Sequence, residues 1–583
     1  MNTKVKQEAE QTSFVWRRRA VLLVMLSAVI ALMARAADLQ IRDKEFLQNQ
    51  GDVRHMRTVE VPAYRGSIID KNGEPLAIST PVDSVWVNPK DLLAEPSYIP
   101  ELAKIIGFKI KDLQSRLEQR KEKEFIYLRR RVQPHIASQV KELKAPGVGL
   151  QREYQRYYPS GEITGHVTGF TDIDDNGQEG LELAYDEWLQ GEPGAKKVLK
   201  DRFGRSVEDV ENIKNPSQGK KLQLSIDKRV QFIAYRELKK AVTRHKARSG
   251  SAVVLDASSG EILAMVNQPS YNPNNRSDFK GSRYRNRAIT DLFEPGSTIK
   301  PLAVATALDL GIINPNTKFN TAPGYMRIGK NSIKDVRNYG SINVKTIIAK
   351  SSNVGVSKIA LAMSPEKMVG TLFDVGFGID TGSGFPGEAS GQLNNKERWH
   401  DIERATLSFG YGVSATTLQL AQAYTVFANK GKLKKVKLID FDDEQVQPED
   451  RQVFSEKTAK QMLQMMEMVT SDEGTAPLAQ IPNYRVAGKT GTVKKSIAGG
   501  YSDDKYLAVF AGVVPVSKPR FVMVVTIDEP SNGDYYSGKV AAPVFSEVMA
   551  DVLRLMNVAP DKVVKTKASG MAEARSKAKG AAA

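Results

Sequence analysis

The stretch FEPGSTIKPL, Phe293–Leu302, places a serine and a lysine three residues apart at the start of an alanine- and leucine-rich run. Pro295 and Gly296 interrupt the chain here, so a helix is predicted to begin at Ser297. Residues three apart on a helix share one face, which puts Ser297 beside Lys300. The pair is either a nucleophile with its own base or a helix N-cap followed by a solvated lysine.

The residue types elsewhere in the chain limit which base could activate a serine. The five histidines are scattered and show neither a Ser-His-Asp setting nor metal-ligand spacing. The chain has no cysteine, which excludes thiol nucleophiles, disulfides and cysteine-bound metals. A lysine can serve as the base if burial or a neighbouring positive charge lowers its pKa toward neutrality. The start of a helix also favours developing negative charge.

Two further motifs follow in the chain and decide between these two interpretations. AKSSNVG contains Ser351-Ser352-Asn353, and VAGKTGTV contains Lys489-Thr490-Gly491-Thr492 on a predicted strand. Ser-x-x-Lys, Ser-Asp-Asn and Lys-Thr-Gly, in this order, are the signature of penicillin-binding proteins and class A β-lactamases. The middle element here is Ser-Ser-Asn, where β-lactamases usually have Ser-Asp-Asn. The alternative requires three coincidences in the right order, so we interpret Ser297 as a nucleophile.

Composition and length set the class of the chain. It has 583 residues, of which 41% are hydrophobic and 26% charged, which is typical of a globular protein with two or more domains. The net charge is +17, with 84 basic and 67 acidic residues. A basic protein can bind an anionic partner. However, the sequence has no nucleic-acid-binding motif, and the basic residues are dispersed, so we expect no nucleic acid partner.

The N-terminus has the pattern of a membrane anchor. Arg17-Arg18-Arg19 precede an uncharged run from Ala20 to Ala34, somewhat shorter than the about 20 residues of a spanning helix. Arg35 can snorkel to the membrane surface, which extends the anchor to residue 39. The three arginines predict a cytoplasmic N-terminus with all later residues outside. A cleaved signal peptide stays open as an alternative, because Ala34-Arg35-Ala36 resembles a cleavage site.

The rest of the chain divides at a polar, Pro/Gly-containing linker, residues 212–221. Strand patterns lie at both ends of the segment that follows, with helices between them, which predicts an α+β domain whose sheet is built from both ends. The predicted segments are 1–19, cytoplasmic; 20–39, transmembrane; 57–211, a non-catalytic domain; 223–558, a catalytic domain; and 561–583, a disordered basic tail.

Nearly the whole chain resembles a class B penicillin-binding protein, a peptidoglycan transpeptidase, and it is most similar to the division type. Besides the anchor and the three motifs, the resemblance is carried by RGSIIDKNGEPLA (65–77), RYYPSGEITGHVTGFTD (156–172), GQEGLE (177–182), SFGYGVSATTLQLAQAY (408–424) and YYSGKVAAPVF (535–545). It implies an N-terminal helix, a β-rich elongated pedestal and a β-lactamase-like transpeptidase domain with a central antiparallel sheet flanked by helices.

The resemblance also implies a role for each motif residue. Lys300 would deprotonate Ser297, and Ser351 would pass a proton to the leaving nitrogen. Asn353 would hold Lys300 and the peptide, while Lys489 would keep Lys300 less basic and attract the substrate carboxylate. Substrate-binding residues would be Thr490, Gly491, Thr492, Tyr411, Tyr535 and Tyr536, the three tyrosines being equally consistent with loop packing. The N–H groups of Ser297 and Thr492 would form the oxyanion hole.

The implied activity is the cross-linking of stem peptides in the septal wall during cell division, at the inner membrane with a periplasmic catalytic domain. β-Lactams would acylate the same serine, and no metal or organic cofactor is needed. The pedestal would dock a membrane glycan polymerase and other division proteins. An elongation-type transpeptidase and a non-enzymatic penicillin-sensing receptor are the alternatives. The donor peptide, the acceptor amine, drug affinities and the oligomeric state do not follow from the sequence.

Overall fold

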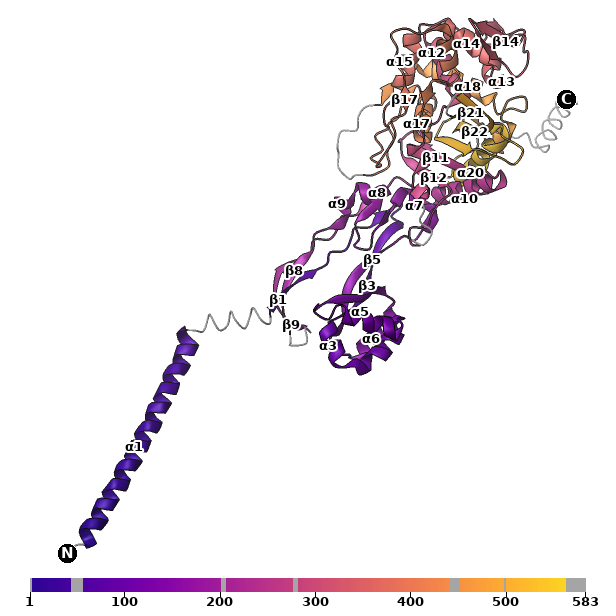
Figure 1. Ribbon diagram of the computed structural model, residues 1–583. Coiled ribbons are helices and arrows are strands. Elements are labelled where there is room, and N and C mark those ends of the chain that lie inside the picture. The colour runs from indigo at the N-terminus through magenta and orange to yellow at the C-terminus, as the bar shows by residue number, and fades with distance from the viewer. Residues whose placement is uncertain are drawn as a thin grey trace, which may run out of the picture. The chain divides into compact units, whose positions relative to one another are not determined.

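The computed structural model describes residues 3–42, 56–200, 206–275, 281–440, 450–497 and 500–562 (Figure 1). The chain forms two compact units that interleave along the sequence. Unit 1 comprises residues 1–63, 81–154 and 191–218, and unit 2 comprises residues 64–80, 155–190 and 219–583. The predicted pedestal, 57–211, therefore contributes residues to both units.

The N-terminal helix α1 (Thr3–Ala37) continues into a short π-helix, η1 (Asp38–Arg42). Its segment Val15–Arg42 is long and apolar enough to cross a membrane, and none of it is buried against the rest of the chain. Leucine, valine and methionine side chains in this segment are exposed, which suits a lipid environment better than water. The sequence also predicts a polar, helical stalk over about residues 38–56, of which residues 43–55 lie outside the described residues.

Unit 1 contains a three-stranded antiparallel sheet and a helical cluster with its own core. The sheet has the order β1-β8-β9, and the second half of β3 pairs with β4, Asp83 lying opposite Val132. Leu102, Leu113 and Leu117 are fully buried in the helical core. The elements are β1 (Met56–Val61), β3 (Pro75–Val87), α3 (Pro89–Ala94), α4 (Ile99–Ile106), α5 (Ile110–Glu118), β4 (Ile126–Val132), α6 (Pro134–Leu143), β5 (Val148–Tyr157), β8 (Gly194–Lys200) and β9 (Ser206–Lys214).

Three of the sequence stretches outside the catalytic motifs meet in one buried ionic cluster of unit 2. Glu182 accepts hydrogen bonds from Arg65 at 2.6 Å and from Arg156 at 2.7 Å. Arg65 also binds Asp186 at 2.7 Å. The nearby elements are β2 (Ile68–Ile69), α7 (Gly165–Thr168), β6 (Phe170–Thr171), β7 (Gly177–Glu179), α8 (Gly180–Ala184), α9 (Asp186–Gln190) and β10 (Leu222–Gln223).

The catalytic segment is built on a five-stranded antiparallel sheet with the order β12-β11-β23-β22-β21. As predicted, its strands come from both ends of the segment. Two strands from the start are joined to three from the end by the pairing of β11 with β23. The strand that carries Lys489 is an edge strand, which leaves one of its sides free for other elements. The strands are β11 (Ser249–Asp256), β12 (Ile262–Gln268), β21 (Ala487–Ile497), β22 (Gly500–Val514) and β23 (Phe521–Asp528).

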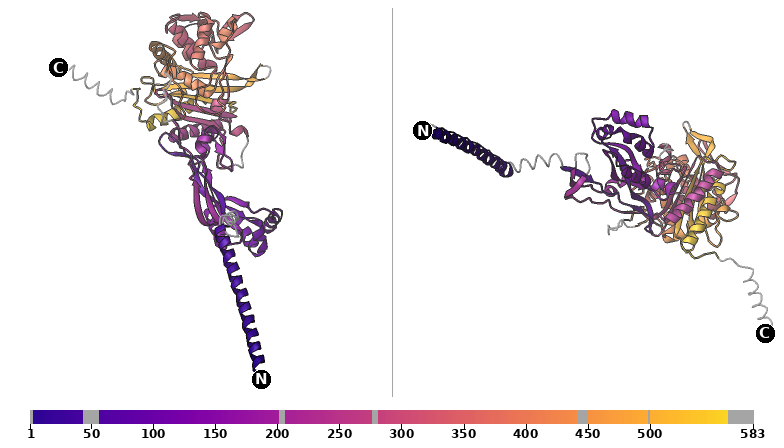
Figure 2. Two further views of the ribbon diagram at one scale, coloured as in Figure 1. Left: turned by 90° about the vertical axis from the view of Figure 1, so that its left-hand side faces the viewer. Right: turned by 90° about the horizontal axis from the view of Figure 1, so that it is seen from below.

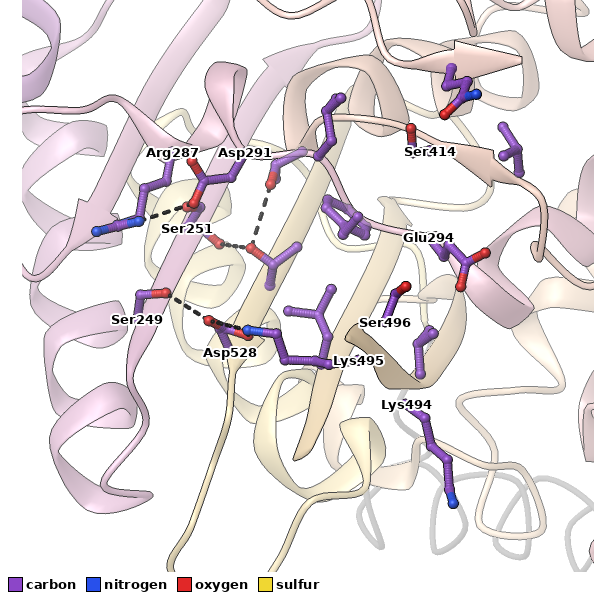
Figure 3. Close-up of a pocket in the computed structure, with 18 of the residues that line it drawn as sticks. Ser249, Ser251, Arg287, Asp291, Glu294, Ser414, Lys494, Lys495, Ser496 and Asp528 are labelled. Carbon is purple, nitrogen blue, oxygen red and sulfur yellow. Dashed lines mark hydrogen bonds and ion pairs between the residues drawn. The ribbon is translucent and has the colours of Figure 1, made fainter. Parts of the chain in front are cut away.

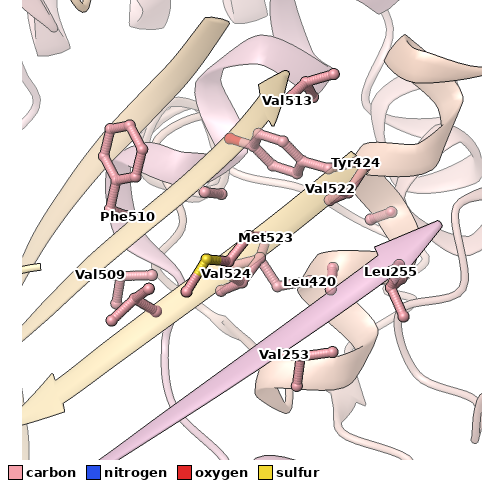
Figure 4. Packing of buried hydrophobic residues seen from close by; sticks show 14 of the residues in the cluster. Val253, Leu255, Leu420, Tyr424, Val509, Phe510, Val513, Val522, Met523 and Val524 are labelled. Atoms are coloured by element: carbon pink, nitrogen blue, oxygen red, sulfur yellow. The ribbon is translucent and has the colours of Figure 1, made fainter. Parts of the chain in front are cut away.

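Helices cover both faces of this sheet, so its strands read as continuous apolar runs. On one face, Leu420 of α17 (Thr417–Ala428) lies among Val253, Val509 and Val524 (Figure 4). On the other face, α10 (Lys228–Arg244) and α20 (Ala542–Leu555) lie side by side (Figures 1 and 2). There the Phe510 and Phe545 rings meet with centroids 5.1 Å apart. The predicted α+β architecture, a central antiparallel sheet flanked by helices, is confirmed.

Further elements of unit 2 are helices and small two-stranded sheets. The helices are α11 (Arg287–Thr290), α12 (Lys300–Asp309), α13 (Val344–Lys350), α14 (Asn353–Leu361), α15 (Pro365–Asp374), α16 (Asp401–Leu407), α17 (Thr417–Ala428), α18 (Glu456–Glu467) and α19 (Ser537–Val540). Small two-stranded sheets pair β13 (Lys318–Asn320) with β16 (Ser341–Asn343), β14 (Tyr325–Ile328) with β15 (Asn331–Lys334), β17 (Gln392–Leu393) with β18 (Val413–Ser414), and β19 (Lys432–Leu433) with β20 (Arg451–Gln452).

Candidate active site

The turn that carries Ser297 is a 3₁₀ turn, η5 (Gly296–Ile299), and the α-helix proper begins at Lys300. Residues three apart eclipse each other in a 3₁₀ turn, so the predicted common face is kept although the helix begins later than predicted. Tyr424 fixes this turn from α17 by donating a hydrogen bond to Thr298 O at 2.7 Å. Both the Tyr424 side chain and Lys300 are fully buried.

Two glycines allow other segments to approach the turn closely. Gly296 has a φ of +56°, and a Cβ there would lie 2.4 Å from Val493 Cγ2. Gly410 has a φ of +88°, and its Cβ would lie 2.2 Å from Gly296 O. Any larger residue would clash at either position and adopt an unfavourable backbone conformation. The turn that carries Ser297 therefore packs between strand β21 and the loop that contains Gly410.

The three motifs converge on two buried lysines. Lys300 Nζ donates to Ser351 O at 2.6 Å and to Asn353 Oδ1 at 2.7 Å, and it lies 3.1 Å from Ser351 Oγ. Lys489 Nζ donates to Ser351 Oγ at 2.8 Å. Both lysine side chains have no exposed surface. The Ser351 hydroxyl thus joins the lysines of the first and third motifs.

The environment makes these lysines unusually weak bases. Burial, followed by the positive charge of Lys489, lowers the pKa of Lys300 well below its ordinary value of 10.5, while Asp335 acts in the opposite direction. Burial lowers the pKa of Lys489 to about 7. A lysine that is neutral near physiological pH can accept a proton, which an ordinary surface lysine cannot do.

The Ser297 hydroxyl forms no hydrogen bond with another described residue, whereas the lysine three residues later is fully bonded. Its side chain is half-buried in the turn and remains accessible. Ser297 therefore lies three residues before the lysine network in the same turn, with an accessible hydroxyl that bonds no other described residue. Catalytic hydrogen bonds commonly tighten only when substrate binds.

The Ser351-Ser352-Asn353 turn is held by a residue that sequence reasoning did not identify. Asp335 accepts hydrogen bonds from Ser352 Oγ at 2.6 Å and from Asn353 N at 2.5 Å. Ser352 in turn caps α14, and Ser351 has a left-handed φ of +58° at the end of α13. No local pattern marks Asp335, because it follows the hairpin β14–β15 and meets the motif only in the folded chain.

The Lys-Thr-Gly strand lies directly against the nucleophile turn. A Cβ on Gly491 would lie 3.0 Å from Pro295 O, so Gly491 permits this approach. Thr490 Oγ1 and Thr475 Oγ1 lie 2.8 Å apart. Thr492 Oγ1 accepts a hydrogen bond from Ser537 N at 3.1 Å and donates one to Ser537 Oγ at 3.2 Å.

The three predicted tyrosines fall into two separate ring clusters. Tyr411 meets the Tyr501 ring edge-on at 5.4 Å, and Tyr535 stacks on Tyr506 at 4.2 Å and on Tyr536 at 4.5 Å. In the described part of the chain, none of the three forms a hydrogen bond or ring contact with the five motif residues that are predicted to be catalytic, namely Ser297, Lys300, Ser351, Asn353 and Lys489. Their assignment as substrate-binding residues therefore stays a prediction.

Glu294, which precedes the turn that carries Ser297, links this turn to the Gly412 loop and to strand β22. It accepts hydrogen bonds from Gly412 N at 3.0 Å and from Tyr501 Oη at 2.9 Å. Beside it, a cavity of about 400 Å³ extends along β21 beyond Thr492 (Figure 3). On the far wall, Asp528 accepts hydrogen bonds from Ser249 and Lys495. None of the five motif residues lines this cavity, so it lies beside the catalytic cluster and does not contain it.

A serine–lysine turn, a Ser-x-Asn turn and a Lys-Thr-Gly edge strand around one antiparallel sheet define an active-site serine acyltransferase of the class shared by penicillin-binding proteins and β-lactamases. Comparison with known families agrees. Residues 250–550 match the penicillin-binding protein transpeptidase domain, and residues 60–224 match the penicillin-binding protein dimerisation domain.

The chain is 44% identical to the peptidoglycan D,D-transpeptidase FtsI of Escherichia coli, covering 96% of this chain and 95% of that protein. It is 42% identical to the probable peptidoglycan D,D-transpeptidase PenA of Neisseria gonorrhoeae, covering 93% of each chain. Penicillin-binding protein 3 of Mycobacterium tuberculosis, solved in complex with aztreonam, is 28% identical, with a TM-score of 0.68 over 86% of this chain and 98% of that one.

The chain therefore belongs to the class B penicillin-binding proteins, and the resemblance stated from the sequence is confirmed. Both family domains are present in the expected order, the dimerisation domain preceding the transpeptidase domain. A β-lactamase does not account for this pair of domains.

Proposed function

We propose that this protein is a peptidoglycan D,D-transpeptidase that cross-links stem peptides of the septal cell wall during cell division. The observation that carries the proposal is the Ser351 hydroxyl, which joins the two buried lysines, Lys300 at 3.1 Å and Lys489 at 2.8 Å. This arrangement supplies a neutral base, a proton path and a retained positive charge within one cluster.

In the first half-reaction, neutral Lys300 takes the proton of the Ser297 hydroxyl, whose oxygen attacks the carbonyl between the two terminal D-alanines. The N–H groups of Ser297 and Thr492 stabilise the oxyanion of the tetrahedral intermediate. The proton moves from Lys300 through the Ser351 hydroxyl to the leaving nitrogen. The C–N bond breaks, D-alanine departs, and an ester on Ser297 remains.

In the second half-reaction, the amine of a neighbouring stem peptide attacks this ester. Lys300, neutral again, accepts the proton that the amine loses, and returns a proton to the Ser297 oxygen as the ester bond breaks. Asn353 holds Lys300 in place through the 2.7 Å hydrogen bond throughout.

Lys489 attracts the donor carboxylate, which Thr490 and Thr492 bind. Gly491 keeps this strand close to the turn, and Tyr411, Tyr535 and Tyr536 contact the substrate. A β-lactam acylates Ser297 by the first half-reaction.

Mass spectrometry of the detergent-solubilised full chain, after incubation with a labelled penicillin, tests the nucleophile. We expect an adduct on the peptide containing Ser297 that disappears in Ser297→Ala. Ser341→Ala, which changes an exposed serine of β16, should keep the adduct. An adduct that survives Ser297→Ala would contradict the assignment.

The division role distinguishes this protein from an elongation-type enzyme, and turnover distinguishes it from a penicillin-sensing receptor. Depletion in the source cell should produce filaments that fail to form septa. Rounded cells would favour elongation. Release of D-alanine from a stem peptide in the presence of an acceptor amine is expected of a transpeptidase, whereas a receptor would stop at the acyl-enzyme.

The apolar helix α1 fits a single-pass inner-membrane protein, with the N-terminus in the cytoplasm and unit 2 in the periplasm. Because the chain has no cysteine, single introduced cysteines report topology without background labelling. A membrane-impermeant maleimide applied to spheroplasts should label Lys330→Cys, on an exposed turn of unit 2, and should not label Ser13→Cys. The opposite pattern would reverse the proposed orientation.

Residues 57–211 form the proposed docking region for a membrane glycan polymerase and other division proteins. The match to a dimerisation domain over residues 60–224 supports a binding role for this part of the chain. Co-purification of such a polymerase with the full chain should be lost when residues 57–211 are deleted. Undiminished co-purification after the deletion would move the interface elsewhere.

A further inference from the structure

The proposed nucleophile and the proposed base are held in place in different ways. Lys300 Nζ donates to Ser351 O at 2.6 Å and to Asn353 Oδ1 at 2.7 Å, and it lies 3.1 Å from Ser351 Oγ. These contacts fix the tip of the lysine side chain. The Ser297 hydroxyl bonds no other described residue, so the position of its oxygen is set by the backbone of the turn that carries it.

This turn, η5, is closed by bonds of its own. Lys300 N donates to Ser297 O across the turn, and Thr298 Oγ1 donates to Pro295 O at 2.6 Å. Residues three apart eclipse each other in a 3₁₀ turn, whereas an α-helical turn of about 3.6 residues offsets them. How closely Ser297 faces Lys300 therefore depends on the winding of this turn.

One side chain from another element reaches the turn. Tyr424 of α17 donates its hydroxyl proton to Thr298 O at 2.7 Å. Among the described residues, no other element provides a side chain that bonds residues 296–299. Both Tyr424 and Thr298 are fully buried, so water does not compete for this carbonyl.

Tyr424 itself is anchored in the core and remains a donor. Its ring meets the Phe427 ring edge-on at 5.6 Å, and Phe427 stacks on Phe454 at 6.2 Å. Burial raises the pKa of Tyr424 well above its ordinary value of 10.0, so the hydroxyl keeps its proton while the buried lysines titrate. The bond to Thr298 O is therefore independent of pH over that range.

We propose that Tyr424 is a positioning residue that sets the place of the Ser297 oxygen by holding the Thr298 carbonyl. It acts through the turn and not on the substrate. This inference rests on the proposed serine nucleophile and deepens it. Because Lys300 keeps its own contacts, loss of the Tyr424 hydroxyl should misplace the serine without changing the basicity of the lysine.

Tyr424→Phe in the solubilised full chain removes the hydroxyl and keeps the ring. Stopped-flow acylation at increasing concentrations of a labelled penicillin separates the non-covalent Kd from the rate constant of acylation. We expect this rate constant to fall between about tenfold and about a hundredfold, because a misplacement of about 1 Å can cost that much rate. Kd should change less than about twofold, since the turn orients the serine and does not bind the drug. The pH at which acylation rises should stay at its wild-type value.

Tyr271→Phe is a matched control for the loss of a buried tyrosine hydroxyl. Tyr271 is also buried, and it donates to a backbone carbonyl, Gly165 O, at the same distance of 2.7 Å. It should lower the urea midpoint as Tyr424→Phe does, and leave the acylation rate constant unchanged. Thr298→Val is a second variant of the turn, which removes the bond to Pro295 O and keeps the shape of the side chain. It should lower the same rate constant.

A wild-type acylation rate constant in folded Tyr424→Phe would overturn the inference. The same result in Thr298→Val would also overturn it, because the winding of the turn would then not set the rate. An equal loss in Tyr271→Phe would reduce the effect to stability, and a shifted pH profile would move the role to Lys300; either result would contradict the proposal. A wild-type chain that penicillin does not acylate at Ser297 would overturn the proposed function instead, so the two failures are distinguishable.

Discussion

Asp335 accepts a 2.6 Å hydrogen bond from Ser352 Oγ, and through this contact a hairpin outside the three motifs sets the position of the Ser-Ser-Asn turn. The same carboxylate accepts Asn353 N at 2.5 Å and Val354 N at 3.0 Å. It therefore caps α14 from another part of the chain. Since Asn353 Oδ1 holds Lys300, the position of Lys300, the proposed base, depends on Asp335.

Asp335→Ala should slow acylation of Ser297 and destabilise the domain. Loss of a cap costs about 1–2 kcal/mol of unfolding free energy. With Asn353 no longer fixed on Lys300, we expect the second-order rate constant for penicillin acylation to fall about tenfold, the effect of one lost hydrogen bond to a charged group. Stopped-flow acylation and urea unfolding measure the two effects.

Asp335→Asn is the informative companion, because its amide keeps an oxygen that accepts the backbone N–H groups. It should retain most of the stability. Asp401→Ala removes an exposed carboxylate at the start of α16 and should leave acylation unchanged. If Asp335→Ala acylated at the wild-type rate, the turn would not depend on this residue.

The two buried lysines predict a bell-shaped pH dependence of acylation. The rate should rise with pH as Lys300 loses its proton and becomes a base, since burial and Lys489 lower its pKa well below 10.5. Burial lowers the pKa of Lys489 to about 7. The acylation rate should therefore fall again as Lys489 loses the charge that attracts the substrate carboxylate. Acylation rates between about pH 5 and 9 span the ordinary range around such a pKa. A rate that increased steadily to the top of this range would mean that Lys300 keeps an ordinary pKa.

Lys489→Met should move the rising part of this profile. Removing the nearby positive charge takes away one of the two causes that lower the pKa of Lys300. That pKa should therefore rise, so a higher pH is needed to produce the neutral base. The falling part should disappear, because the group that titrates there is gone. Lys350→Met, which changes an exposed contact to Glu473 O, is the control and should keep the wild-type profile.

The sequence was sufficient to select the motif residues that the fold brings together, because each motif is local. Ser297 and Lys300 share a turn, Ser351 and Asn353 share another, and Lys489 lies on a strand that also carries Thr490. Their mutual contacts could then be anticipated from the order of the motifs. The edge position of β21 could not be predicted, because strand order depends on pairing between residues that are far apart in the chain.

Supporting residues were missed for the same reason. Asp335 and Thr475 lie in no motif, and their partners are brought to them only by folding. Tyr424 and Ser537 fall within stretches that carried the family resemblance, yet no pattern indicated that they bond Thr298 O and Thr492. The interleaving of units 1 and 2 was also beyond the sequence, since a single linker at 212–221 predicts one boundary, whereas residues 64–80 and 155–190 pack with unit 2.

Glu182→Ala should destabilise unit 2 strongly, although Glu182 belongs to none of the catalytic motifs. Its carboxylate is fully buried between Arg65 at 2.6 Å and Arg156 at 2.7 Å. Removing one partner of a buried ion pair leaves uncompensated charge and costs about 3–5 kcal/mol. Urea unfolding measures this loss, and penicillin acylation of Ser297 reports whether the catalytic fold survives. Asp534→Ala, which removes a half-exposed partner of Lys539, should leave the unfolding midpoint unchanged. Equal midpoints for the two variants would mean that the arginines find water or other acceptors once Glu182 is removed.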